Sequence, residues 1–262
     1  MARETGWLQQ PLNRVLTPLM RRAWDLEITG LHHIPTSGPA LLTPNHLSFI
    51  DSVFVMSLMP RRTLAVGKAD YMDSWKTRYF FPATGMIPLD RSGGAASQVA
   101  LDAAAASLER GDLFLIYPEG TRTRDGYLHK GRTGAARLAL RTGAPIIPIG
   151  LVGTDRIQPP DRVMPKLRER CEINIGAPID VSHYRDEIDN RLVLRQITDE
   201  MMFEISELSG QTYVDVYSGD ALPDDLHAAG DAVDLTTTSA PPPPPDPAPA
   251  PIRTADPAAA AQ

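Results

Sequence analysis

The chain has 262 residues, of which 42% are hydrophobic, and a formal net charge of −6 at pH 7. This length suits one α/β domain with some additional chain, and the acidic balance argues against a nucleic-acid partner. The single cysteine, Cys171, excludes an intramolecular disulfide and a cysteine-rich metal site, and fits a reducing compartment. The N-terminal stretch lacks the core of a signal peptide, and no run of about 18 apolar residues predicts a transmembrane helix.

Apolar strands alternate with helical patterns along the body of the chain. We expect strands at residues 26–34, 39–45, 62–68, 86–91, 112–120, 144–155 and 171–179. We expect helices at residues 48–59, 71–85, 96–111, 133–143 and 185–210. Buried strands that alternate with helices predict an α/β fold, in which a mostly parallel twisted sheet is flanked by helices in a single domain.

The two ends of the chain differ from this body. Residues 1–25 form an amphipathic segment with four arginines, whose two prolines should shorten any helix. It would lie in a membrane interface or pack against the body. Residues 219–262 hold seven Asp and one Arg and are rich in Pro and Ala, so we expect a disordered acidic tail. Residues 26–218 remain as the folded domain.

Polar residues follow three of the expected strands. The stretch NHLSFID separates His46 from Asp51 by five positions, which on one helix would leave them roughly 140° apart. The two side chains can therefore meet only across a bend between strand and helix. Arg91 follows a second strand, and Glu119 to Arg122 follow a third. Carboxyl ends of parallel strands share one edge of a sheet, so these residues should lie together.

These blocks resemble the glycerolipid acyltransferases of the 1-acylglycerol-3-phosphate acyltransferase type. NHLSFID, GMIPLDR, YPEGTR and APIIPIG are similar to that family's four ordered blocks, and the resemblance covers about residues 25–210. Tyr117 stands where the family often has Phe. The resemblance implies the glycerolipid acyltransferase fold and an O-acyltransferase of phospholipid biosynthesis. Such an enzyme moves a fatty acyl chain from acyl-CoA or acyl-carrier protein to 1-acylglycerol 3-phosphate, giving phosphatidic acid.

His46 and Asp51 suit this chemistry as a base and its orienting carboxylate. A histidine can take the proton of a hydroxyl that attacks a thioester near neutral pH. A carboxylate on the other ring nitrogen fixes the tautomer, as in a catalytic triad. The competing interpretation is that Asn45 and His46 only cap the following helix. We expect the thioester as substrate, with no further cofactor and no metal.

The resemblance implies that Arg91 and Arg122 bind the acceptor phosphate, with Glu119 and Gly120 beside them. Glu119 would orient an arginine or the glycerol hydroxyls, or form a buried ion pair with an arginine. For Lys68, Lys130 and Arg132, a solvated charge is at least as good an interpretation as phosphate binding. The secondary candidates are Asn45, Ser48, Thr121 and Lys68.

Several alternatives stay open from the sequence. The same residues would serve glycerol 3-phosphate or another lysolipid as acceptor. A His-dependent hydrolase or a non-catalytic lipid binder is the alternative of another class, although no GxSxG motif supports a serine hydrolase. Residues 71–85 would line an acyl channel, dip into lipid or form a core helix. We expect peripheral attachment to the cytoplasmic face of a membrane.

Overall fold

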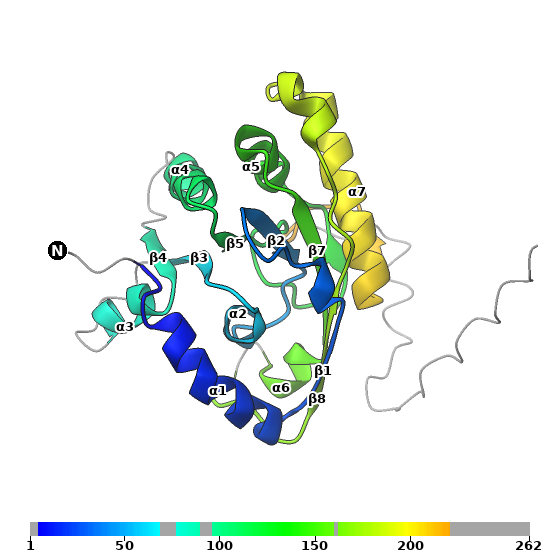
Figure 1. Ribbon diagram of the computed structural model, residues 1–262. Coiled ribbons are helices and arrows are strands. Elements are labelled where there is room, and N and C mark those ends of the chain that lie inside the picture. Colours follow the sequence, from blue (N-terminus) through cyan, green and yellow to red (C-terminus); the bar gives the residue numbers. More distant parts are fainter. Residues whose placement is uncertain (1–4, 69–76, 90–95, 160–161, 221–262) are drawn as a thin grey trace, which may run out of the picture. The chain divides into compact units, whose positions relative to one another are not determined.

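The computed structural model describes residues 5–68, 77–89, 96–159 and 162–220 (Figure 1). Contacts divide the chain into two units, Met1–Ala221 and Leu222–Gln262, and the description concerns the first. The expected acidic tail, apart from its first two residues, lies outside the described residues. So do Arg91 and the first part of the expected helix at 71–85.

A seven-stranded sheet forms the centre of this unit, and the prediction of a mostly parallel sheet is confirmed. The strands lie in the order β1-β8-β7-β2-β5-β3-β4, and every neighbouring pair is parallel except β7 and β8. Their bounds are β1 (Asp25–Thr29), β2 (Ala40–Pro44), β3 (Thr63–Lys68), β4 (Met86–Leu89), β5 (Leu113–Leu115), β7 (Ile146–Val152) and β8 (Arg170–Ile175).

Helices cover both faces of the sheet. Figure 1 shows α4, α5 and α7 on one face and α1, α2 and α6 on the other. Alternate residues of β2 explain this, because Leu41 belongs to one buried apolar cluster while Ala40 and Leu42 belong to the other. The helices are α1 (Gln9–Ala23), α2 (Ile50–Leu58), α3 (Thr77–Ala83), α4 (Ala96–Glu109), α5 (Gly134–Thr142), α6 (Thr154–Ile157) and α7 (Arg191–Ser209).

Gly150 in the middle of β7 allows α7 to approach the sheet closely. A Cβ atom at this position would lie 2.3 Å from the backbone carbonyl carbon of Leu208, a distance that no side chain tolerates. Only glycine therefore lets the last turn of α7 rest directly on the strand. Gly210 then ends the helix in a left-handed conformation.

The helix α1 is longer than the sequence predicted, because its two prolines do not shorten it. Pro11 lies in the first turn, where the missing N–H has no helical partner, and Pro18 is tolerated inside a continuous helix of 15 residues. Among the described helices, none is both long enough and apolar enough to cross a bilayer.

Polar side chains fix α1 to the body. The Gln9 amide pairs with the backbone N–H and C=O of Thr63, both at 2.8 Å. Asn13 and Thr17 donate hydrogen bonds of 3.0 and 2.9 Å to carbonyl oxygens in the last turn of α2, which have no helical partner of their own. One side of α1 thus packs on the body, while its other side is exposed.

The expected final helix at 185–210 is wrong in its extent. A 3₁₀ helix covers Ser182–Glu187, and α7 begins only at Arg191, after Asn190 accepts a hydrogen bond from the backbone N–H of Leu192. An asparagine at this position competes with helix continuation by capping the next one. A second, two-stranded sheet of β6 (Leu128–His129) and β9 (Tyr213–Val214) was not predicted, because each strand has only two residues.

Candidate active site

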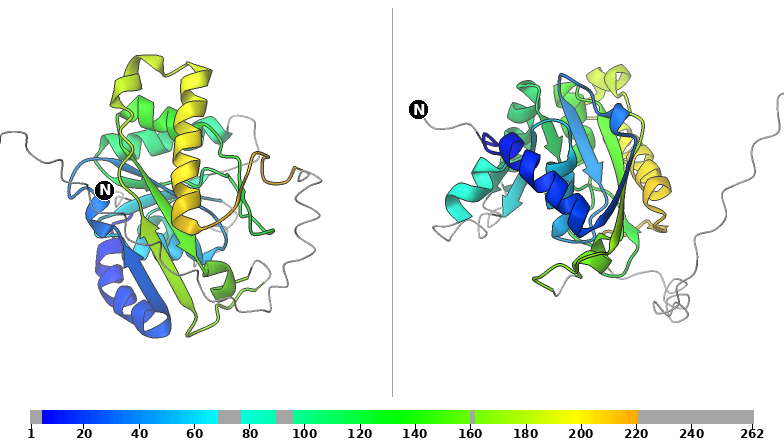
Figure 2. Two further views of the ribbon diagram at one scale, coloured as in Figure 1. Left: turned by 90° about the vertical axis from the view of Figure 1, so that its right-hand side faces the viewer. Right: turned by 60° about the horizontal axis from the view of Figure 1, so that its bottom comes forward.

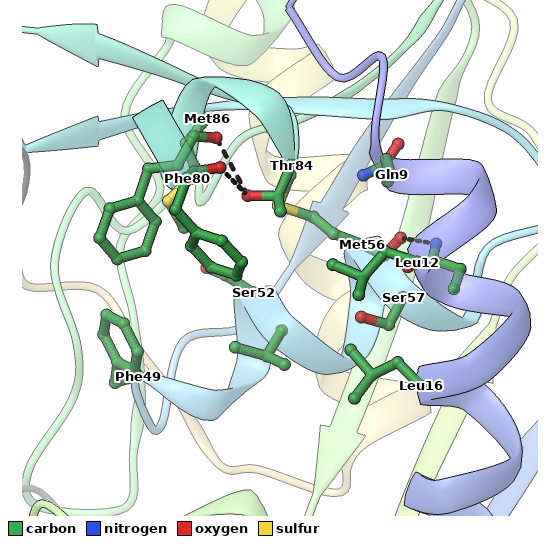
Figure 3. Close-up of a pocket in the computed structure, with 13 residues that line it drawn as sticks. Gln9, Leu12, Leu16, Phe49, Ser52, Met56, Ser57, Phe80, Thr84 and Met86 are labelled. Carbon is green, nitrogen blue, oxygen red and sulfur yellow. Dashed lines mark hydrogen bonds between the residues drawn. The ribbon is translucent and has the colours of Figure 1, made fainter. Parts of the chain in front are cut away.

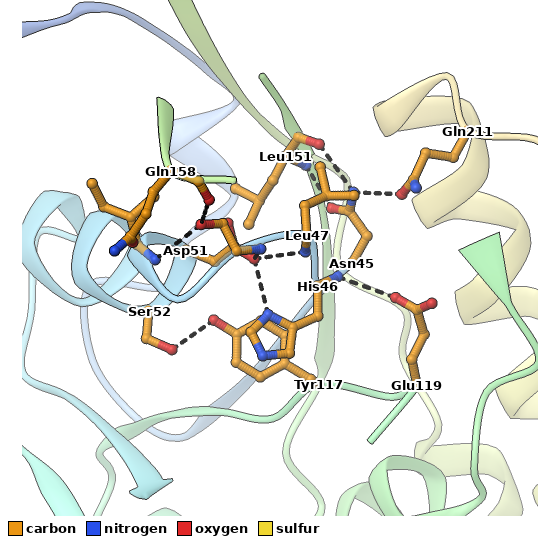
Figure 4. A network of polar contacts seen from close by, with 12 residues as sticks. Asn45, His46, Leu47, Asp51, Ser52, Tyr117, Glu119, Leu151, Gln158 and Gln211 are labelled. Atoms are coloured by element: carbon orange, nitrogen blue, oxygen red, sulfur yellow. Dashed lines mark hydrogen bonds and ion pairs between the residues drawn. The ribbon is translucent and has the colours of Figure 1, made fainter. Parts of the chain in front are cut away.

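His46 and Asp51 meet at the carboxyl edge of the sheet. β2 ends at Pro44, two residues before His46, and Asp51 lies in the first turn of α2. Their side chains are joined by a hydrogen bond of 2.9 Å between Nδ1 of His46 and Oδ2 of Asp51 (Figure 4). The strand-to-helix bend supplies the approach that the spacing requires.

Asp51 holds the whole bend, not only the imidazole. Its carboxylate is fully buried, and Oδ2 also accepts the backbone N–H groups of Leu47 and Ser48, each at 2.8 Å. Because a carboxylate accepts and cannot donate when ionised, this arrangement places the proton of the imidazole on Nδ1. Within the described residues, Nε2 of His46 has no hydrogen-bond partner, and the side chain is 16% exposed. The unprotonated nitrogen is therefore available to a substrate.

Tyr117 contacts one face of the His46 imidazole. Its ring stacks on that of His46 with centroids 3.7 Å apart and planes inclined by 13°. Its hydroxyl shares a hydrogen bond of 2.8 Å with that of Ser52, in the first turn of α2. Burial, reinforced by the negative charge of Asp51, raises the pKa of Tyr117 well above its usual value. The phenol therefore stays neutral, and its role beside His46 is to position the ring.

Glu119 supports the backbone of the same bend from the opposite side. Its two carboxyl oxygens accept the backbone N–H groups of His46 and His129, both at 3.1 Å. The side chain is 1% exposed, and burial raises its pKa to about 7 against the lowering effect of these two hydrogen bonds. These backbone partners were not anticipated from the sequence, which suggested an arginine or a substrate hydroxyl.

Asn45 and Ser48 also act on the backbone. The Asn45 amide donates to the carbonyl oxygen of Leu151 at 3.0 Å and accepts from its N–H at 2.7 Å. The Ser48 hydroxyl donates to the carbonyl oxygen of Gln158 at 2.6 Å. Both side chains are fully buried, so they fix the residues flanking His46 and do not face a substrate.

The basic candidates are placed unequally. Arg122 is half-buried, and the next residue, Thr123, donates its backbone N–H to the carbonyl oxygen of His46 at 2.9 Å. The turn that carries Arg122 thus lies directly beside His46. Gly120 and Thr121 are exposed in this turn. Lys68 is the last residue of β3, and its side chain lies outside the described part, as does all of Arg91.

A C-terminal segment that the sequence did not point to closes over this turn. Gln211 accepts from the Asn45 amide at 2.6 Å and donates to the carbonyl oxygen of Gly126 at 2.8 Å. His129, 2% exposed, lies 3.0 Å from the carboxylate of Asp125. The two contacts of Gln211 join chain segments 166 and 85 residues apart, so no local spacing could have revealed them.

An apolar pocket of about 310 Å³ lies between α1, α2 and α3, and Ser52 is part of its lining (Figure 3). This volume is at the lower end of the range for small-molecule sites. Side chains of all three helices line it, including Leu12, Leu16, Val53, Met56, Phe80 and Phe81. Ser52, which lines the pocket, is hydrogen-bonded to Tyr117, and Tyr117 stacks on His46. One end of the pocket is therefore connected to His46 through these two side chains.

Comparisons with known proteins find similar acyltransferases. A 1-acyl-sn-glycerol-3-phosphate acyltransferase of Limnanthes douglasii is 36% identical over 130 residues, which are 49% of this chain and 46% of that protein. The human 1-acyl-sn-glycerol-3-phosphate acyltransferase alpha is 30% identical over 125 residues, which are 47% of this chain and 44% of that protein. The chain thus spans less than half the length of these relatives.

A solved structure supports the fold independently. The crystal structure of the 1-acyl-sn-glycerophosphate acyltransferase PlsC from Thermotoga maritima matches with a TM-score of 0.57 and 19% identity. The match covers 74% of this chain and 79% of that one. At this identity, the similarity establishes the α/β fold alone.

The family model named Acyltransferase matches residues 25–152, a range that begins at β1 and ends with β7. It includes His46, Asp51, Glu119 and Arg122. Residues 25–152 are therefore similar to the acyltransferase family.

Proposed function

We propose that the chain transfers a fatty acyl group from a thioester donor to 1-acylglycerol 3-phosphate, giving phosphatidic acid. The observation that carries this proposal is the pairing of His46 Nδ1 with the buried Asp51 carboxylate, 2.9 Å apart, within the residues similar to the acyltransferase family. The names of the relatives supply the acceptor. The residue pair supplies the chemistry, since an oriented imidazole is what attack by a hydroxyl requires.

In this mechanism, Nε2 of His46 takes the proton as the free glycerol hydroxyl attacks the thioester carbonyl. Asp51 keeps Nδ1 protonated and stabilises the imidazolium that forms. The tetrahedral intermediate then collapses, the C–S bond breaks, and His46 returns its proton to the departing thiolate. The products are the new ester and a free thiol, and the enzyme returns to its starting protonation state.

The acyl chain of the donor occupies the apolar pocket between α1, α2 and α3. The pocket begins beside Ser52, whose hydroxyl is bonded to Tyr117, so a chain within it would present its thioester near His46. Burying each methylene of such a chain contributes about 0.8 kcal/mol. Acyl-CoA and acyl-carrier protein offer the same chain and the same thioester.

The phosphate of the acceptor binds at the turn that follows β5. Arg122 lies in that turn, directly beside the backbone of His46, and an arginine fork matches phosphate geometry. Arg91, two positions beyond the end of β4, contributes the second guanidinium in this proposal.

The enzyme works at the cytoplasmic face of a membrane, where both the acceptor and the product reside. On α1, Leu12 and Leu16 line the pocket, while Val15 and Leu19 are 61% and 57% exposed. At 100° per residue, Leu12, Val15 and Leu19 follow one stripe of the helix. This apolar stripe leads from the surface to the pocket, which suits entry of an acyl chain from lipid.

Product analysis tests the proposal. Labelled acyl-CoA would be supplied with 1-acylglycerol 3-phosphate, glycerol 3-phosphate or a lysophospholipid without a terminal phosphate, and products identified by mass spectrometry. We expect phosphatidic acid from the first acceptor, and none from folded His46→Ala. Preferred acylation of glycerol 3-phosphate would change the acceptor. Release of free fatty acid alone would indicate a hydrolase, and binding without turnover would indicate a lipid binder.

A further inference from the structure

The loop between α6 and β8 displays large apolar side chains in solvent. Val163, Met164 and Leu167 are 86%, 77% and 64% exposed, which is high for apolar residues that lie so close together. Between and beside them stand three exposed cations, namely Arg162, Lys166 and Arg168. Residues 162–168 contain no acidic residue, whereas Asp161 precedes them and Glu169 follows them in the sequence.

Hydrogen bonds hold the backbone of this loop against the body. The Gln158 side chain donates to the carbonyl oxygen of Val163 at 2.9 Å, and the N–H of Lys166 donates to the carbonyl oxygen of Ile157 at 2.7 Å. The backbone polar groups are thus engaged inward while the apolar side chains point to solvent. A loop built this way presents its side chains without having to reorganise.

The same loop is attached to the end of α1. Trp24 donates its indole N–H to the carbonyl oxygen of Lys166 at 2.6 Å, and the N–H of Arg168 bonds the carbonyl oxygen of Ala23 at 2.8 Å. The loop therefore lies beside the last turn of α1, which carries the exposed Arg21 and Arg22 (Figure 2). Asp25 and Glu27 follow α1 in the sequence, and Glu27 forms an ion pair with Arg170.

We infer that residues 162–168 form a second membrane-contacting element, which acts with α1 and binds a bilayer that contains anionic phospholipid. Val163, Met164 and Leu167 enter the interfacial region, while the cations pair with lipid phosphates. This inference rests on the proposed function, whose substrate is a membrane lipid. Two attached elements would fix how the protein lies on the bilayer, with the apolar stripe of α1 toward the lipid.

An acidic carrier protein is the competing partner for a basic loop. The bilayer is favoured because the cations are interleaved with apolar side chains that are at least 64% exposed. An acidic protein surface would neutralise the three positive charges of the loop, but it would place the apolar side chains of the loop against polar groups. The test below distinguishes the two partners.

Vesicle sedimentation with the full chain tests the inference. The vesicles would contain phosphatidylcholine alone or with phosphatidylglycerol, and the variants would be V163S/M164S/L167S and R162Q/K166Q/R168Q. Each cation near an anionic surface contributes about 1 kcal/mol, so losing three should weaken binding to phosphatidylglycerol vesicles on the order of a hundredfold at low salt. The apolar variant should lose at least about tenfold on both kinds of vesicle.

L192S/F203S is the matched control, since Leu192 and Phe203 are 81% and 62% exposed on α7. It should bind like the wild type, and thermal melting should confirm that all variants fold. Transfer between a short-chain donor and a water-soluble short-chain acceptor should be unchanged in every variant. Absence of that transfer in the wild type would contradict the proposed function instead. Vesicle binding at the wild-type level by both loop variants would overturn the inference. Normal vesicle binding with a selective loss of activity toward acyl-carrier-protein donors would also overturn it, in favour of the carrier protein.

Discussion

Tyr117 lies flat against His46, with ring centroids 3.7 Å apart and planes inclined by 13°. The same tyrosine reaches Ser52 with its hydroxyl, so one side chain connects the imidazole to the wall of the apolar pocket. Contact with the ring restricts the imidazole to one orientation, which leaves Nε2 directed away from Asp51. The stack and the hydroxyl bond make separable contributions, and two substitutions distinguish them.

Tyr117→Phe should cost about 0.5–1.5 kcal/mol of unfolding free energy, the usual worth of one hydrogen bond, and change kcat only severalfold. Tyr117→Ala should lower kcat roughly a hundredfold, because the imidazole loses the surface that positions it. Steady-state kinetics and chemical denaturation measure the two effects. Ser52→Ala is the control for the hydroxyl and should match Tyr117→Phe. Equal loss of kcat in Phe and Ala variants would show that the hydroxyl, not the stack, matters.

Asp51→Asn should reduce kcat by about 10³- to 10⁴-fold. An asparagine amide turned toward Nδ1 would favour the wrong tautomer, with the proton on Nε2 where the substrate hydroxyl must be deprotonated. Part of the loss also comes from the backbone N–H groups of Leu47 and Ser48, which share the carboxylate. Asp102→Asn, on the exposed side of α4, is the control and should retain activity. Wild-type turnover in folded Asp51→Asn would disprove the pairing.

The sequence predicted the contact between His46 and Asp51, because a spacing of five across a strand-to-helix bend is local information. It also located the Arg122 turn, since parallel strands place their carboxyl ends at one edge. It could not predict that Gln211 would hold Asn45, because 166 residues separate them. The Phe-to-Tyr difference at position 117 was visible, but the direction of the ring depends on packing that periodicity does not encode.

Glu119 should make stability depend on pH. Its pKa in the folded chain is about 7, against 4.5 for a free glutamate, so between these values the folded state binds more protons than the unfolded state. The free energy of unfolding should therefore fall as pH rises from 4.5 to 7, by up to about 3 kcal/mol, and level off above. Glu119→Gln lacks this titration. Chemical denaturation of the wild type and of Glu119→Gln from pH 4.5 to 7 measures the free energy of unfolding of each. Parallel pH dependences of the two proteins would contradict the prediction.

Val53→Phe should shorten the acyl chains that the enzyme accepts. Val53 lines the pocket, and a phenyl group there would occupy space that a long chain needs. We expect kcat/KM to fall about 10- to 100-fold for long-chain thioesters, matching the usual 1–3 kcal/mol cost of overpacking, and to change little for short ones. Val99→Phe, exposed on α4, is the control of equal added bulk. Equal losses at every chain length would place the acyl chain elsewhere.

Arg122 tests whether the enzyme reads a phosphate. Its turn is fixed beside the base by the hydrogen bond from Thr123 to His46, so its guanidinium can reach an acceptor whose hydroxyl faces Nε2. Arg122→Ala should lower kcat/KM for 1-acylglycerol 3-phosphate by about 1.5–3 kcal/mol, or roughly 10- to 150-fold. Arg91→Ala should act alike. Monoacylglycerol, which lacks the phosphate, should be a poor acceptor for the wild type.

The two changes form a cycle in which the ligand is one partner. If Arg122 contacts the phosphate, then Arg122→Ala should lower kcat/KM for monoacylglycerol only slightly, because that acceptor already lacks the phosphate that the arginine would bind. Arg137→Ala, exposed on α5, is the matched arginine and should leave the cycle unchanged. Equal losses for both acceptors in Arg122→Ala would mean that the arginine supports the turn or the thioester donor. The acceptor phosphate would then be bound by other residues.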